Sequence, residues 1–149
     1  MNSFKKMFLV LSIVIPSTLH AGVYTDDLSK CLVDSSTSED KITLAKWMFT
    51  AMTLHPAVAS MSTVTSKQRD DANKGMGELM VDLISVRCLE QSKKAIKNEG
   101  QSALEASFNV LGQVAGKELL ANPNVALGLA GLKANIDSNL LNKRLGITP

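Results

Sequence analysis

The sequence predicts an all-α protein, a compact single-domain bundle of about five helices tied by one disulfide. Three observations favour this class. Helix-start signals recur at short intervals, apolar residues repeat every three or four positions, and no alternating strand pattern of useful length interrupts them. In addition, the pair of cysteines, Cys31 and Cys88, can link two helices covalently.

The first 21 residues have the layout of a secretory signal peptide. Lys5 and Lys6 precede the apolar run from Met7 to Ile15, and a turn-prone segment ends at Ala21, where we expect cleavage. This run is too short to span a bilayer and no later one is longer, so we expect no stable membrane insertion. The domain would then be residues 22–149, and its location the periplasm.

The charge of the expected mature domain excludes one class of function. Without the two signal lysines, 14 basic side chains face 14 acidic ones, and the net charge is zero. No basic cluster remains, so the sequence lacks the footprint of a nucleic-acid-binding protein.

The two cysteines predict a structural disulfide, because paired cysteines in an exported domain are usually bonded. A redox-active pair would need Cys-x-x-Cys or a similar local motif, which is absent. We expect the helix that holds Cys31 to pack against the third helix near Val81 and Ile84.

The first two helices have clear start signals. Thr25 is the expected N-cap of the first, with acids in its first turn. Ser36 and Glu39 form an expected capping box for the second, which ends at His55 because Pro56 follows.

Three further helices complete the chain. The third opens with the capping pair of Thr65 and Gln68 and runs to about residue 98, with a bend expected at 75–77. The fourth starts at Ser102, and its Gly112 and Gly116 predict a close helix crossing. The fifth runs from Asn122–Pro123 to Gly146. The apolar stripe of the fourth comprises Leu104, Phe108, Leu111, Ala115 and Leu119.

The second helix, within the stretch EDKITLAKWMFTAMTLHP (39–56), is apolar around most of its circumference. A surface helix needs a narrower stripe, so this helix is either central and packed on several sides or has one flank facing a ligand or partner. We favour the central position. If one flank instead faces a ligand or partner, that flank carries Trp47 and Leu54.

Two polar residues stand among apolar neighbours. We interpret His55 as a cap on the carbonyls of its own helix, because the expected mature chain offers no second histidine for a metal and no triad partners. Arg87 either binds an anionic group, lies at a bend near Cys88, or rests its stem on apolar surface with its charged head in water. We predict no catalytic residue, metal site or cofactor. The candidate ligand pocket consists of Met48, Met52, His55, Met76, Met80 and Arg87.

The last helix has two apolar stripes. We assign the first to the core: Val125, Leu129, Leu132, Ile136 and Leu140. The second, with Leu127, Ala134, Leu141 and Leu145, is either an interaction surface or folds back onto the core through a bend after Gly128 and Gly131. The candidate partner surface is therefore Leu127, Leu141, Leu145, Trp47 and Leu54.

Three segments carry a resemblance: KCLVDSSTSEDK, KWMFTAMTLHPAV and LGQVAGKELL. Together they resemble small exported all-helical proteins of Gram-negative bacteria, a group with no assigned activity. The resemblance covers most of the expected mature chain. It implies export, an all-helical fold and the pairing of Cys31 with Cys88, and it lends no catalytic residue.

These features favour a small periplasmic, non-enzymatic binding protein that acts on another protein as an inhibitor, immunity factor or assembly helper. A homodimer through the last helix is a further expectation. The alternative is a carrier of a small apolar ligand, held in a methionine-rich pocket between the second helix and the Met76–Ile84 face.

Overall fold

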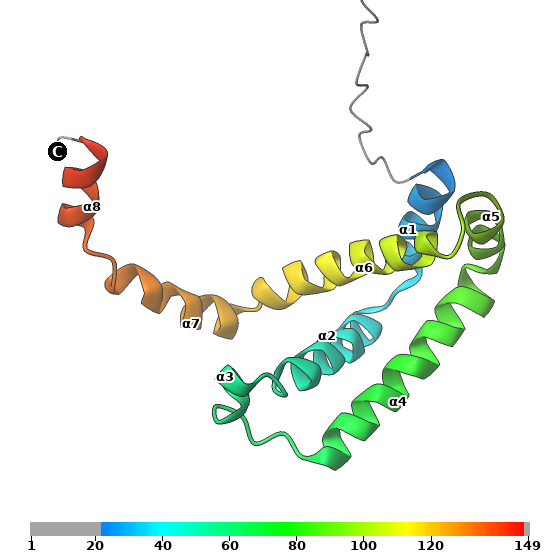
Figure 1. Cartoon of the computed structure of the whole chain (residues 1–149), viewed down its shortest axis with the longest axis horizontal. Helices are drawn as coiled ribbons and strands as arrows, with labels where there is room; N and C mark the ends of the chain where they lie inside the picture. Colours follow the sequence, from blue (N-terminus) through cyan, green and yellow to red (C-terminus); the bar gives the residue numbers. More distant parts are fainter. Residues whose placement is uncertain (1–21, 148–149) are drawn as a thin grey trace, which may run out of the picture.

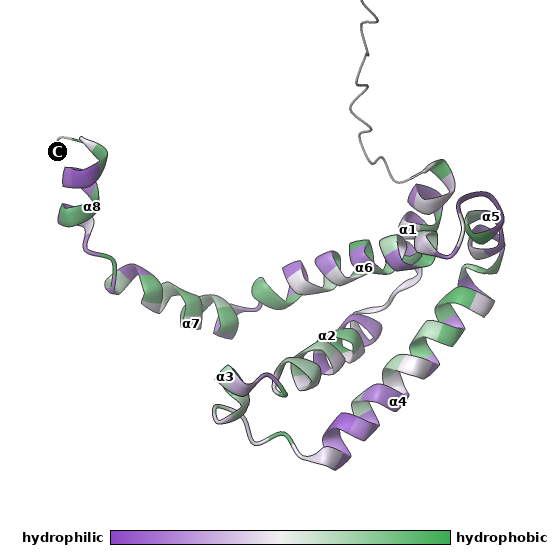
Figure 2. Cartoon of the chain, viewed as in Figure 1, coloured by the Kyte–Doolittle hydropathy of each residue, from purple (hydrophilic) through white to green (hydrophobic). Residues whose placement is uncertain are grey.

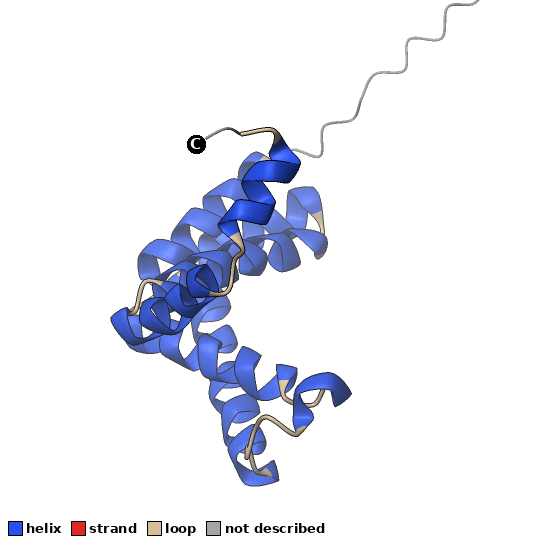
Figure 3. Ribbon diagram, turned by 90° about the vertical axis from the view of Figure 1, so that its left-hand side faces the viewer, coloured by secondary structure: helices blue, strands red, loops and turns tan. Residues whose placement is uncertain are grey.

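The computed structural model describes residues 22–147, so the expected signal peptide, residues 1–21, lies outside the described part. The all-α class is confirmed there, since these residues form helices and no strand (Figure 3). The number of helices is larger than expected, with eight α-helices and one π-helical turn. These are α1 (Val23–Ser35), α2 (Ser38–Met52), α3 (Pro56–Ala59), α4 (Ser66–Asp82), η1 (Leu83–Arg87), α5 (Leu89–Glu99), α6 (Ser102–Leu120), α7 (Pro123–Ala134) and α8 (Ser138–Leu145).

The core is built around α1, which packs against α5, α6 and η1 (Figure 1). Leu28 and Leu32, four residues apart on α1, have no exposed surface. Leu83 and Leu111 meet them from η1 and α6. Full burial of such a side chain contributes about 1.5–3 kcal/mol to stability, so these leucines hold α1 in place.

The Cys31–Cys88 disulfide is confirmed, and it joins α1 to the residue that follows η1. The expected packing of the Cys31 helix near Ile84 agrees with the structure, since α1 contacts η1, which contains Ile84. Val81 lies one turn earlier on α4 and is exposed, and the other neighbours of α1 are α5 and α6. The π-helical turn places Cys88 beyond the end of α4.

The expected third helix is interrupted at a different place from the one predicted. Gly75 and Gly77 lie inside an unbroken α4, and the direction changes at η1, where the amide of Cys88 donates to the carbonyl of Leu83 five residues back. This wider hydrogen-bonding turn inserts one residue and ends α4. Helix α5 then leaves in a new direction (Figure 1).

The N-terminus of α1 is capped by a distant carboxylate rather than by Thr25, which lies inside the helix. Glu99 accepts hydrogen bonds from the amides of Tyr24 and Thr25 at 3.0 and 2.9 Å and from the Thr25 hydroxyl at 2.6 Å. The hydroxyl and the two amides lower the pKa of Glu99 below its usual value. Gly22 makes room for this carboxylate, because a Cβ there would lie 2.2 Å from Glu99 Cδ.

The capping signals expected for the other helices are confirmed at two helix starts and differ at two others. The Thr65–Gln68 capping box and the Asn122 cap are confirmed. The box of the second helix is shifted by one residue and uses Thr37 and Asp40, while Gln101, which precedes α6, makes no side-chain cap. Local capping patterns therefore place most helix starts to within a residue or two.

The central position favoured for the second helix is wrong. Within α2, Leu44 is the buried side chain, and Ile42, Phe49 and Met52 are exposed. Helix α2 contacts α4 on one side and α6 on another, and the rest of its circumference is uncovered. Its surplus of apolar residues therefore lies on the surface.

The last helix is two helices, and the assignment of its first stripe to the core is wrong. The chain breaks at Asn135–Asp137, where the Asp137 side chain caps α8, and not after the glycines at 128 and 131. Neither α7 nor α8 contains a buried residue. We call residues 122–147 the arm, and it extends away from the body formed by residues 22–121 (Figure 1).

Removing the disulfide is expected to destabilise the body strongly. The bond closes a loop between residues 57 positions apart, which the chain-entropy relation converts to about 4 kcal/mol. We expect the variant Cys31→Ser to lower the denaturant midpoint and to make it insensitive to reductant. A wild-type midpoint that does not change on reduction would contradict the stabilising role of the bond.

Replacing Glu99 is expected to loosen the N-terminus of α1. The pKa of Glu99 is lower in the folded chain, so its contribution is complete above the ordinary glutamate pKa and is lost as the pH falls through the folded value. Glu99→Gln should lower the thermal midpoint at pH 7 and reduce its decline in acid. Gly22→Ala, whose methyl displaces the carboxylate, should act in the same direction. Glu78→Gln, on the exposed face of α4, is the control.

Candidate functional site

An apolar groove lies between α2, α4 and α6, with a volume of about 1100 Å3. Its wall and floor come from four elements that are distant in sequence, α2, α4, η1 and α6. The apolar lining residues are Leu44, Trp47, Met48, Met76, Met80, Ile84, Leu104, Phe108 and Gly112. Glu105 is the one charged residue that lines it, and the rest of the rim is polar and uncharged. The surface therefore suits an elongated apolar occupant.

Packing of α2 against its neighbours fixes the groove. Leu44 and Met76 are buried at its base, between α2 and α4. The Trp47 indole donates a hydrogen bond to Asn73 Oδ1 at 3.1 Å, which is a second contact between α2 and α4. On the other side, Lys41 pairs with Glu118 at 2.6 Å and joins α2 to α6. Both walls are thus held by direct contacts.

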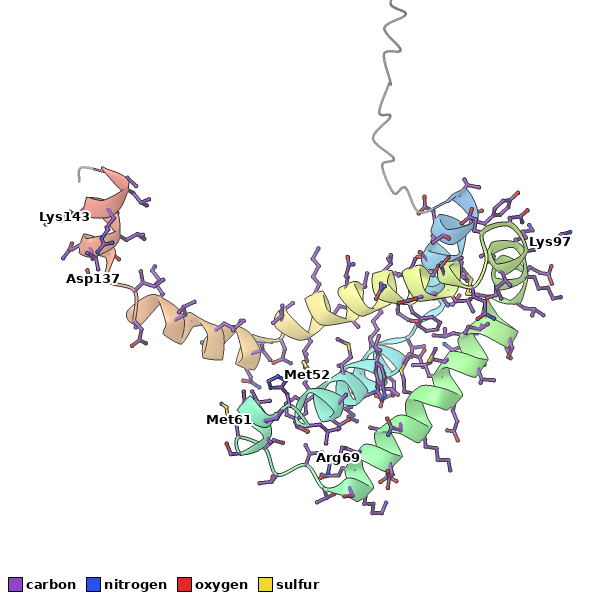
Figure 4. The ribbon with its side chains drawn as sticks, in the orientation of Figure 1. Met52, Met61, Arg69, Lys97, Asp137 and Lys143 are labelled. Atoms are coloured by element: carbon purple, nitrogen blue, oxygen red, sulfur yellow. A yellow bond between two sulfur atoms is a disulfide. The ribbon has the colours of Figure 1, made fainter. Side chains whose placement is uncertain are left out.

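Three of the six residues of the expected ligand pocket lie together. Met48, Met76 and Met80 line the groove from α2 and α4. Met52 lies one turn further along α2 on an exposed surface and does not line the groove (Figure 4). His55 and Arg87 also lie elsewhere.

His55 does not cap the carbonyls of its own helix, so that interpretation is wrong. Its Nδ1 accepts a hydrogen bond from the Ala57 amide at 3.2 Å and caps the N-terminus of α3, the next helix. The extended backbone conformation imposed by Pro56 turns the imidazole forward instead of back.

Arg87 joins three segments. It donates to the Ser35 carbonyl at 2.8 Å and pairs with Asp40 at 2.6 Å and Asp82 at 2.5 Å. Hydrogen bonds to Asp40 and Asp82 raise the pKa of the guanidinium. Burial opposes ionisation of Asp40, but the hydrogen bonds from Arg87 and Thr37 lower its pKa overall. Because two carboxylates already neutralise it, this arginine fits the bend interpretation better than an anion site.

The residues of the expected partner surface fall into two groups. Leu127, Leu141 and Leu145 are exposed on the arm, and Leu127 has 73% of its surface accessible. Trp47 belongs to the wall of the groove, and Leu54 is exposed beyond the end of α2. Figure 2 shows the apolar character of α7 and much of α2.

The α6 side of the groove was not recognised from the sequence. Leu104 and Phe108 belong to the apolar stripe of the fourth expected helix, and both are partly buried against the core. The expected close crossing at Gly112 and Gly116 is also wrong, since an added Cβ at either position meets nothing within 4 Å. A glycine that leaves a helix face open in this way was the available signal for a docking surface.

Other kinds of site find little support in the part of the chain that the structure describes. No group of three or more His, Cys, Asp and Glu residues is placed to hold a metal ion within it. The helices described there include none that is both long and apolar enough for a membrane span.

Comparisons with protein families, with curated proteins and with solved structures found no match.

Charges placed on α8 are expected to leave the body folded. Leu141 and Leu145 are exposed and α8 buries no residue, so the double variant Leu141→Glu, Leu145→Glu should keep its far-ultraviolet circular dichroism and unfold cooperatively. Loss of cooperative unfolding would show that these leucines contribute to the core of the body.

Proposed function

We propose that this chain is an exported, non-enzymatic protein that binds an apolar helix of another protein in the groove between α2, α4 and α6. The role would be that of an inhibitor, immunity factor or assembly helper. The observation that carries the proposal is the groove itself, an apolar surface about 1100 Å3 in volume with one charged lining residue. Grooves of this kind commonly receive the apolar face of a helix.

The composition of the groove supports a protein partner. Met48, Met76 and Met80 can repack around different side chains, and Trp47 and Phe108 provide aromatic surface of the type enriched at interfaces. Polar side chains at the rim, such as Gln101 and Gln113, can bond to the solvent-facing side of a bound helix.

The disulfide supports export, because such bonds persist in oxidising compartments. The amino-terminal segment 1–21 supports it independently through its signal-peptide pattern. Together they favour the periplasm as the place of action.

The second candidate is a carrier of a small apolar ligand, favoured by the three methionines that line one surface. Pockets for small ligands usually enclose about 300–1000 Å3 and bury most of the ligand. This groove, at about 1100 Å3, is larger and is not an enclosed cavity. A native mass spectrum of protein from cells separates the two, since a retained lipid-sized mass supports the carrier.

Site-specific crosslinking tests the proposal. A photoreactive phenylalanine analogue at Met80, in the groove, should form an adduct with a segment of a different protein in living cells, identified by mass spectrometry. The same analogue at Met61, which is 82% exposed and outside the groove, is the matched control (Figure 4).

A blocking variant makes the test sharper. Gly112→Leu adds a side chain into the groove where an added Cβ meets nothing within 4 Å, so the fold should tolerate it while the adduct is lost. Gly77→Leu, on an open part of α4 outside the groove, should retain the adduct. If Met80 captures no protein other than the chain itself, the proposed function is wrong.

A further inference from the structure

Two apolar surfaces of this chain lack a partner in the described structure: the groove of the body and the arm. We propose that the arm of one copy lies in the groove of a second copy, and that two copies exchange arms reciprocally to form a dimer. This goes beyond the proposed function, because it names what covers the groove when no other protein is bound.

The arm exposes apolar surface of a kind that is normally buried against other protein. Between Pro123 and Ala134 the polar side chains are Asn124 and Lys133 alone, and a helix that is apolar all round is normally buried. Isolated helices of 12 and 8 residues are marginal in water. The large apolar side chains exposed on the arm are Leu127, Leu129, Leu132, Ile136, Leu140, Leu141, Leu145 and Ile147.

The sequence nevertheless specifies both helices of the arm in detail. Asn122 caps α7 and Pro123 occupies its first position. Asp137 caps α8, and Gly146 ends it in the left-handed conformation at φ 67°. Such start and stop signals indicate that both helices are formed in the functional state. Because their intrinsic helix propensity is not sufficient at this length, packing against another surface must stabilise them.

The dimensions of arm and groove agree. Along α6 the groove is lined from Gln101 to Gln113, which is about 20 Å at 1.5 Å per residue. Helix α7 has 12 residues and a length of about 18 Å, so it fits within the groove. An added Cβ at Gly112, in the groove, or at Gly128 and Gly131, on α7, meets nothing within 4 Å, so these helices can approach one another closely.

The net charges of the body and of the arm are opposite in sign, and the one charged residue that lines the groove, Glu105, is acidic. The body, residues 22–121, carries 11 basic and 13 acidic side chains, a net charge of −2. The arm carries Lys133, Lys143 and Arg144 against Asp137, a net charge of +2. Docking of an arm on a body brings opposite charges together, whereas pairing of two arms brings like charges together.

The connection between α6 and α7 favours a second copy over the arm's own body. Asn122 has φ −61° and ψ 130°, an extended conformation that the following Pro123 enforces. Helix α7 therefore continues outward from the end of α6, and Asp137 and Lys143 of α8 lie far from the body (Figure 4). Exchange of an element between identical chains is a low-cost route to a symmetric dimer.

The oligomeric state of the purified chain with its disulfide intact tests the inference. Light scattering after size-exclusion chromatography should give twice the chain mass for the wild type and for Gly77→Leu. Gly112→Leu, which blocks the groove, and Leu127→Glu with Leu132→Glu, which places charge on the arm, should give the monomer mass. All four proteins should unfold cooperatively, since each substitution is at an open position.

Mixing the two defective chains distinguishes arm exchange from arm-to-arm pairing. Gly112→Leu has an intact arm and the double variant has an intact groove, so equal amounts should form a heterodimer with one docked arm. Pairing between arms predicts no heterodimer, because each mixed pair of one Gly112→Leu chain and one double-variant chain would contain one charged arm. Its absence from the mixture would overturn the proposal.

Three other results would also overturn it. A monomeric wild type whose arm amides are protected from hydrogen exchange would show that the arm covers its own body. A monomeric wild type that binds anionic phospholipid vesicles through Leu127 and Leu132 would identify a membrane surface as the occupant. A wild-type dimer that Gly112→Leu leaves intact would place the interface elsewhere.

Failure of this inference and failure of the proposed function are separable. A monomeric wild type that still crosslinks to another protein through Met80 would retain the function and remove the dimer. A wild-type dimer whose Met80 analogue captures the arm of its own chain alone would retain the dimer and remove the function.

Discussion

The position of α1 between α5 and α6 is the constraint on which the rest of the body depends. Leu28 and Leu32 bury it at the centre, and Cys31 bonds it to Cys88 at the end of the π-helical turn. Glu99, the last residue of α5, holds its N-terminus. Because α1 is held at its N-terminus, at its centre and at Cys31, it positions α5 and α6 relative to each other, and η1 joins this assembly to α4.

This arrangement places the core at one end of the molecule and leaves the other end open. Helices α2 and α4 pack on each other through Leu44 and Met76, and α2 reaches α6 through the Lys41–Glu118 ion pair. The groove is the space that these contacts leave along one side of α6. On α6 the groove is lined by the face that carries Leu104 and Phe108, which adjoins the buried face of Ser107 and Leu111.

Local signals in the sequence predict much of this structure. The helical class, the disulfide and the Thr65 and Asn122 caps follow from residues that are close in sequence or unique in the chain. The capping of α1 by Glu99 depends on contacts between residues far apart in the sequence, since Thr25 and Glu99 are 74 positions apart. Such contacts exist only once the chain has folded, so no local pattern marks them.

The errors at α2 and α7 have a common physical cause. In both helices apolar residues surround most of the circumference, and burial was expected because the hydrophobic effect favours it. The hydrophobic effect indicates that these apolar faces should be buried, but it does not indicate which chain buries them. In α2 the exposed residues include Phe49 and Met52, and in α7 they include Leu127 and Leu132. Helix α2 gives only Leu44 to the core and α7 gives no buried residue, so both helices keep apolar surface exposed. The opposite net charges of arm and body favour cover of the arm by a body.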